Sequence, residues 1–150
     1  MKYLLDTDAI NAIFDDKSPF FRVARSHLIN LSKSDKIYIS ILSIYELEFS
    51  VSNTENEALI IKIKELISEL KRIFEILPLS LNGAEIYGIL KSGLQKKTGI
   101  NRKAIKKHSI DLMIASNAID HKCILVARDH IYKNHLTLLD DRLIVEDWTS

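Results

Sequence analysis

The sequence has little of what marks secreted or membrane-spanning proteins. Its single cysteine, Cys123, excludes an internal disulfide, and its apolar surroundings suit a buried structural thiol more than a nucleophile. No apolar run approaches the roughly 20 residues that cross a bilayer. The N-terminus runs directly into Leu4, Leu5 and Asp6, without the apolar core and cleavage site of a signal peptide. We therefore expect a cytoplasmic protein with no membrane partner.

The chain also lacks a strong net charge, internal repeats and low-complexity linkers. A formal charge of +1 gives no global attraction to nucleic acid, so such binding would need a local basic patch. With 47% hydrophobic and 27% charged residues, the composition is that of an ordinary globular protein. A length of 150 residues matches one domain, residues 1–150, which can bury roughly two-thirds of its unfolded surface.

Short apolar runs alternate with segments of helical periodicity, and this pattern predicts an α/β protein with a parallel sheet. We expect the strands at residues 2–5, 37–41, 76–77, 122–127 and 143–145. We expect helices at residues 8–14, 21–31, 55–74, 82–95 and 112–119, with one more helix starting at Ser43. The helix at 55–74 is the longest amphipathic segment.

The first apolar run, which begins at Tyr3, stops at two carboxylates, Asp6 and Asp8. A continuous apolar run of this length is typical of a strand buried on both faces. Asp6 would then lie at the carboxyl end of a parallel strand, where ligand crevices form in open α/β sheets. The alternative is that Asp6 or Asp8 only caps the following helix, because aspartate is a favoured N-cap.

Three more acidic residues occupy comparable places. Ser43 and Glu46 have the spacing of a capping box, with Ser43 as N-cap and Glu46 as its reciprocal partner. Asp111 lies in the first turn of a late helix, and Asp129 follows the fourth strand. Taken singly, these acids could be only cap, first-turn and turn residues.

If the strands are parallel neighbours, Asp6, Glu46, Asp111 and Asp129 point into one crevice. Clustered carboxylates repel each other unless a cation lies among them. Mg²⁺ and Mn²⁺ prefer oxygen ligands, and either ion could orient a water and neutralise a phosphate during hydrolysis.

Four segments of the sequence resemble the signature blocks of the PIN-domain family, and the likeness is greatest to VapC-type toxin ribonucleases. The resemblance covers essentially the whole chain, in order. The four segments are Leu4-Leu5-Asp6-Thr7-Asp8, Ser43-Ile44-Tyr45-Glu46-Leu47, Asp111-Leu112-Met113-Ile114-Ala115-Ser116 and Leu125-Val126-Ala127-Arg128-Asp129.

The resemblance implies an α/β/α fold, in which helices flank a central parallel sheet of four to five strands. It also implies a Mg²⁺- or Mn²⁺-dependent endoribonuclease, commonly a homodimer, that acts as the toxin of a type II toxin–antitoxin pair. A cognate antitoxin protein would neutralise it, and RNA would be its substrate.

By position, the resemblance makes Asp6 and Asp111 the main metal ligands. Asp129 becomes a further acidic member of the catalytic set, and Glu46 a carboxylate that binds metal or orients water. Asp8 and Ser43 take supporting places.

The fourth block departs from the family pattern at two positions. Ala127 stands where threonine or serine is usual, and Ile131 where a second acidic residue often follows. A second metal site would therefore be poorer in this chain.

A basic stretch leads directly into Asp111 and is the candidate for holding RNA phosphates. Its alternative is a solvated surface segment, which is what most charge runs are. Its members are Lys96, Lys97, Arg102, Lys103, Lys106 and Lys107. The helix at 55–74 could pack only on its own domain, or its apolar face could also receive a second copy or an antitoxin helix.

Two other functions remain open from the residues. Asp6 and Asp8 also suit a haloacid-dehalogenase-like phosphatase, with Asp6 as nucleophile and Asp8 as acid/base. Against this, Ala9 and Ile10 follow where such enzymes usually have Gly-Thr, and Glu46 would have no role. The second alternative is a non-catalytic PIN-like module that binds RNA or a protein.

Overall fold

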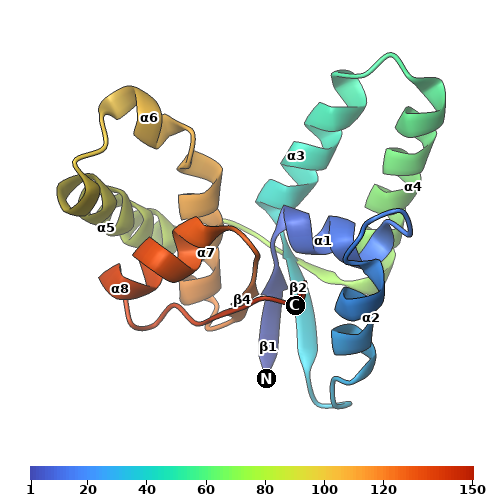
Figure 1. Ribbon diagram of the computed structural model, residues 1–150, viewed down its shortest axis with the longest axis horizontal. Helices are drawn as coiled ribbons and strands as arrows, with labels where there is room; N and C mark the ends of the chain where they lie inside the picture. The colour runs from blue at the N-terminus through green and yellow to red at the C-terminus, as the bar shows by residue number, and fades with distance from the viewer.

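The computed structural model describes all 150 residues and places a five-stranded sheet at the centre of the molecule (Figure 1). The strand order is β3-β2-β1-β4-β5, and every neighbouring pair is parallel. The strands are β1 (Lys2–Leu5), β2 (Lys36–Ser40), β3 (Glu75–Leu77), β4 (Ile124–Val126) and β5 (Val145–Glu146). The predicted α/β architecture is confirmed.

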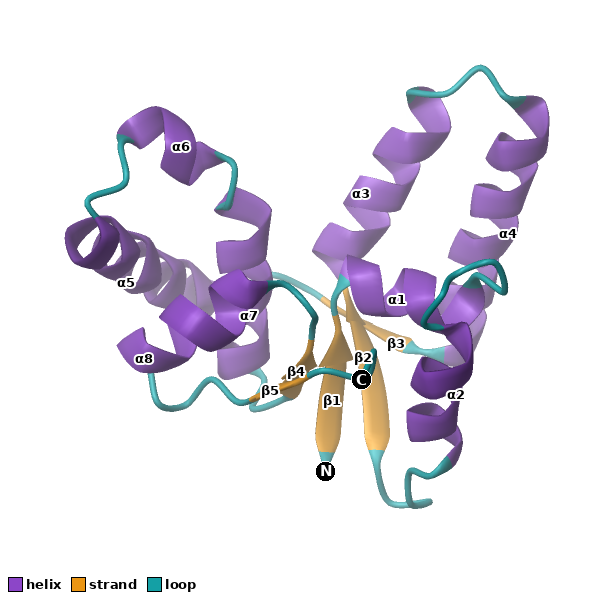
Figure 2. Ribbon diagram, in the orientation of Figure 1, coloured by secondary structure: helices purple, strands orange, loops and turns teal.

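Helices cover both faces of the sheet. They are α1 (Thr7–Phe14), α2 (Phe21–Ile29), α3 (Ile41–Ser52), α4 (Glu57–Ile73), α5 (Leu81–Thr98), α6 (Arg102–Lys106), α7 (Ser109–Asp120), the π-helix η1 (Tyr132–Leu136) and α8 (Thr137–Leu139). Figure 2 shows α1 to α4 on one side of the sheet and α5 to α8 on the other. None of the helices combines the length and apolar content that a membrane span requires.

The central strand β1 supplies side chains to both layers. Tyr3 and Leu5 belong to a core with residues of α1, α3 and α4, whereas Leu4 belongs to a core with residues of α5 and α7. Successive strand residues point to opposite faces, so a strand covered on both sides must be apolar throughout. This explains the unbroken apolar run before Asp6.

Two helices begin immediately where a strand ends, and this keeps the following polar residues at the carboxyl edge of the sheet. Asp6 is the N-cap of α1, directly after β1, and Ser40 is the N-cap of α3 at the end of β2. The capping box predicted at Ser43 and Glu46 is therefore wrong. Ser43 lies inside α3 and is buried, because the helix starts at Ile41.

Several predicted boundaries shift by a few residues. The strand expected at 122–127 is limited to β4, because Lys122 has a positive φ of 57° in the turn that precedes it. The strand expected at 143–145 begins only at Val145. The helix expected at 82–95 continues to Thr98, where Gly99 adopts the left-handed φ of 65° that commonly ends helices.

Cys123 is buried, with 5% of its surface exposed. Burial raises the pKa of its thiol to about 11, so the thiol stays protonated at neutral pH. This is the environment of a structural cysteine, as its apolar surroundings predicted.

Candidate functional site

Asp6 lies at the carboxyl end of the central strand and is almost completely buried, with 4% of its surface exposed. Its backbone N–H donates to the carbonyl of Val126 at 3.0 Å, which ties it to β4. Its Oδ1 accepts the N–H of Ala9 at 2.8 Å. Asp6 is therefore the helix cap that the alternative interpretation described, and it lies at the carboxyl end of the central strand. Asp8 is exposed and caps nothing.

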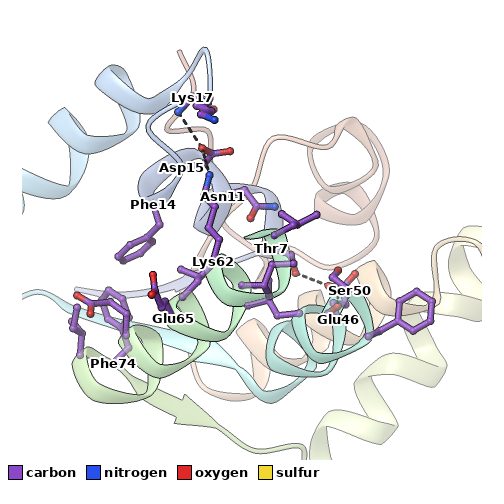
Figure 3. Close-up of a pocket in the computed structure, with 18 of the residues that line it drawn as sticks. Thr7, Asn11, Phe14, Asp15, Lys17, Glu46, Ser50, Lys62, Glu65 and Phe74 are labelled. Atoms are coloured by element: carbon purple, nitrogen blue, oxygen red, sulfur yellow. Dashed lines mark hydrogen bonds and ion pairs between the residues drawn. The ribbon is translucent and has the colours of Figure 1, made fainter. Parts of the chain in front are cut away.

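Glu46 approaches the same edge from α3. The hydroxyl of Thr7 donates to Oε1 of Glu46 at 2.5 Å, and Oγ of Ser43 lies 3.2 Å from that hydroxyl. Figure 3 shows Thr7 and Glu46 facing each other from α1 and α3. The carboxylate therefore bonds to a different element, and not back to its own helix as a capping box requires.

Asp111 is held from two sides in the first turn of α7. The hydroxyl of Tyr132 donates to Oδ1 of Asp111 at 3.1 Å. Nδ1 of His108 lies 3.6 Å from Oδ2, close enough for an ion pair when the histidine is protonated. His108 lies near an acidic position of the sequence, where we expect a surface or packing residue more than a metal ligand.

Asp129 is exposed and follows β4. Its Oδ1 accepts the N–H of Ile131 at 2.9 Å, so it also shapes the start of the next helical segment. Ala127 and Ile131, the two departures from the family pattern, are buried at 2% and 7% exposure in the apolar core. The fourth block therefore offers one carboxylate.

The acidic side chains influence one another through their charges. Burial is the main cause that raises the pKa of Asp6 to about 8; the charges of Asp8, Asp111 and Glu46 add to it, and the hydrogen bond from Ala9 opposes it. Burial also raises the pKa of Asp111, and the charge of the nearby Asp129 contributes.

The site offers the donors that a hard divalent cation prefers: carboxylate oxygens with uncompensated negative charge. Burial, with a smaller contribution from neighbouring carboxylates, raises the pKa values of Asp6 and Asp111, and a cation bound among them would favour their charged forms. The residues therefore fit a cation. No three His, Cys, Asp or Glu side chains are close enough to hold a metal as they stand. A cation would have to draw the carboxylates together.

The tertiary structure adds two residues that the sequence analysis did not single out, Thr7 and Tyr132. Thr7 lies inside the first motif, and its position next to Asp6 was the available signal. Tyr132 is fully buried, and burial together with the charges of Asp111, Asp6 and Asp129 raises the pKa of its hydroxyl well above 10. No periodicity or spacing pointed to it.

The basic residues lie on one continuous stretch of chain. Lys96 and Lys97 are in the last turn of α5, and Arg102, Lys103 and Lys106 are on α6. Lys107 follows α6, just before α7 brings in Asp111. All six are exposed, and none of them forms a salt bridge.

A groove of about 1450 Å³ starts at the site and runs between α1, α3 and α4. Figure 3 shows Thr7, Glu46 and Phe14 among the residues that line it. Phe49 and Leu59 also belong to its apolar lining. Phe49 is 67% exposed and Leu59 is 42% exposed. The apolar face of the longest amphipathic helix is therefore partly uncovered.

The molecule belongs to the class of α/β proteins that have a parallel sheet and acidic side chains after its central strands. The PIN domain family model matches residues 3–135, so the chain belongs to the PIN-domain family. No curated protein sequence gives a significant match.

Solved structures share this fold. VapBC2 from Rickettsia felis, bound to a DNA fragment from its promoter, is 25% identical, covers 99% of both chains and gives a TM-score of 0.76. VapBC-1 from nontypeable Haemophilus influenzae is 20% identical over 100% of both chains, with a TM-score of 0.73. FitAcB from Neisseria gonorrhoeae is 22% identical over 97% of both chains, with a TM-score of 0.74.

Proposed function

We propose that this protein is a divalent-metal-dependent endoribonuclease and the toxin of a type II toxin–antitoxin pair. The observation that carries the proposal is that, in a chain matching the PIN-domain family model, the charges of Glu46 and Asp111 act on Asp6 at the carboxyl end of β1, and the charge of Asp129 acts on Asp111. The family match gives no support to the phosphatase alternative.

In this proposal Asp6 and Asp111 hold Mg²⁺ or Mn²⁺, and Asp129 adds negative charge beside Asp111. A bound divalent cation would neutralise charge at the phosphate and make water a better nucleophile. Glu46, fixed by Thr7, orients the attacking water and accepts its proton. The water oxygen bonds to phosphorus as the bond to the leaving sugar oxygen breaks, and that oxygen takes up a proton from a solvent water.

The six exposed cations between Lys96 and Lys107 bind the RNA backbone in this proposal. Phosphate contacts give affinity without reading sequence, so they hold the strand beside Asp111 whatever its bases are. None of the six is neutralised by a carboxylate within the chain.

The groove between α1, α3 and α4 is the proposed docking site for an antitoxin helix. An amphipathic helix can bury its apolar face in such a groove, and an occupant there would lie next to Glu46. The structural neighbours VapBC2 and VapBC-1 are themselves described as VapBC assemblies.

We also infer a homodimer. Leu81 and Ile89 of α5 lie outside the groove and are 92% and 60% exposed, which leaves apolar surface for a second copy. Light scattering at micromolar concentration should give twice the chain mass of 17.2 kDa. A monomer mass would contradict the dimer.

The nuclease is tested with purified protein and RNA, with Mg²⁺, with Mn²⁺ and with EDTA. Cleavage should require the metal, and Asp6→Asn should abolish it. Asp16→Asn, a change at an exposed aspartate in the loop after α1, should leave cleavage unchanged.

Other results would contradict the proposal. Metal-independent cleavage that survives Asp6→Asn would exclude the acidic site as its source. Hydrolysis of p-nitrophenyl phosphate with RNA left intact would indicate a phosphatase. RNA binding without cleavage under either metal would indicate a non-catalytic module.

A further inference from the structure

Tyr132 places a polar hydroxyl inside the apolar core. Its side chain has 0% exposure and belongs to the apolar core with Leu112 and Leu136. A buried hydroxyl is costly unless it finds a partner. The partner of this one is Oδ1 of Asp111, at 3.1 Å.

The backbone around Tyr132 brings the hydroxyl to that place. Asp129 accepts the N–H of Ile131, and the π-helix η1 then begins at Tyr132 itself. A π-turn is wider than an α-turn and is often found at functional sites. The bond from Tyr132 thus joins the segment after β4 to the first turn of α7, across 21 residues of sequence.

We infer that Tyr132 is a positioning residue of the acidic site: its hydroxyl fixes the carboxylate of Asp111 in the orientation in which it takes a divalent cation. This inference rests on the proposed metal-dependent function. One hydrogen bond uses one lone pair of Oδ1, so the second lone pair of Oδ1 remains for the cation, as does Oδ2 when His108 is neutral.

Without the hydroxyl, the Asp111 side chain would lose its only donor at Oδ1. The side chain is 30% exposed, so water could replace the bond but could not fix one orientation. The carboxylate would then have to be ordered when the cation binds. Mutation of the hydrogen-bond partners of metal ligands typically lowers metal affinity or activity by about 10- to 100-fold.

The test is Tyr132→Phe, with Mn²⁺ as the probe. Titration calorimetry without RNA should give Mn²⁺ binding about tenfold weaker than in the wild type. Cleavage should need correspondingly more Mn²⁺, whereas kcat at saturating Mn²⁺ should recover most of the wild-type value. Tyr3→Phe is the matched control, because Tyr3 is also buried but lies at the start of β1 with its hydroxyl near Met1.

The stoichiometry of Mn²⁺ binding distinguishes a positioning role of Tyr132 from a purely structural one. Partial unfolding would lower the number of Mn²⁺ sites but leave the dissociation constant of the folded molecules unchanged, and this result would overturn the inference. In addition, Tyr132→Phe should weaken Mn²⁺ binding no further in an Asp111→Asn background, because both changes act on one ligand. If Tyr132→Phe weakens Mn²⁺ binding in the Asp111→Asn background as much as it does in the wild type, the inference is also overturned.

Failure of this inference differs from failure of the proposed function. If the wild type binds and uses Mn²⁺ and Tyr132→Phe matches it in affinity, only the role of Tyr132 is wrong. If the wild type neither binds Mn²⁺ nor cleaves RNA with it, the metal-dependent function is wrong and the inference falls with it.

Discussion

The hydroxyl of Thr7 lies 2.5 Å from Oε1 of Glu46, and this bond joins the first turn of α1 to α3 beside the buried carboxylate of Asp6. Charge-assisted hydrogen bonds of this kind are short and orient both groups. Thr7 therefore fixes the one carboxylate of the set that we assign to the attacking water.

Replacement of Thr7 by valine should release Glu46 while keeping the shape of the side chain. We expect kcat of RNA cleavage to fall by roughly tenfold, and the free energy of unfolding to fall by about 1.5–3 kcal/mol at most, as for other hydrogen bonds to charged groups. Thr149→Val is the matched control, because it removes a similar bond of 2.6 Å to Asp147 near the C-terminus. Equal kcat in the two variants would exclude the role of Thr7.

Asp6 should make the metal-free protein less stable as the pH rises. Its pKa is about 8 in the folded state and near 3.8 when unfolded, so its protonated form is the one that folding favours. Below the unfolded pKa both states are protonated and there is no penalty. Between the two pKa values, the unfolded state releases its proton first, and stability falls by up to about 1.4 kcal/mol per pH unit from this group.

The measurement is urea unfolding in EDTA from pH 4 to pH 8. The free energy of unfolding of Asp6→Asn should fall less steeply over this range than that of the wild type, because asparagine does not ionise and can still accept the N–H of Ala9. Asp16→Asn should follow the wild-type curve. Parallel curves for all three proteins would show that burial of Asp6 carries no such penalty.

The basic stretch should set the affinity for RNA and its dependence on salt. Neutralising Lys106 and Lys107 with glutamine should weaken binding, and the slope of log K against log salt should decrease by about 0.7 for each lost phosphate contact with single-stranded RNA. Lys33 and Lys36, exposed near the opposite, amino-terminal edge of the sheet, provide the control pair. Fluorescence anisotropy of labelled RNA, with the lysine changes made in the catalytically inactive Asp6→Asn protein, measures both the affinity and its salt dependence. An unchanged slope would place the RNA elsewhere.

A negative charge in the groove should prevent antitoxin binding without affecting cleavage. Leu59 lines the groove, whereas Ile61 lies on the same helix α4, is 58% exposed and does not line it. We expect Leu59→Asp to lose binding to the antitoxin candidate encoded by the adjacent reading frame, while Ile61→Asp binds as the wild type does. Pull-down with that purified candidate tests this. Loss of binding in both variants, or in neither, would contradict the groove assignment.

Burial on α4 should decide the cost of truncating its aliphatic side chains. Leu70 has 0% exposure in the core beside β2, so Leu70→Ala should lower the free energy of unfolding by about 2–5 kcal/mol. Ile61→Ala on the same helix should change it by less than about 0.5 kcal/mol. Denaturant unfolding of both variants gives the comparison, and similar costs would show that α4 is not packed as described.

Much of the fold could be predicted from local patterns. The run from Tyr3 to Leu5 is apolar because β1 is covered on both faces, and the periodicity of α4 reflects its contact with the sheet on one side only. The ends of elements were harder to predict. The capping-box spacing predicted Ser43 as the cap of α3, whereas the cap is Ser40, because the helix starts without a loop after β2.

The sequence by itself determined that Asp6 and Asp129 follow strands and that Glu46 and Asp111 lie near the starts of helices, because strand and helix periodicity are local properties of the chain. Only the tertiary structure decided what each carboxylate touches. Thr7 meets Glu46 across 39 residues and Tyr132 meets Asp111 across 21, and contacts at such separations depend on how layers pack. Side-chain hydrogen bonds between elements leave no periodic trace in a sequence, which is why these two partners became visible only in the folded chain.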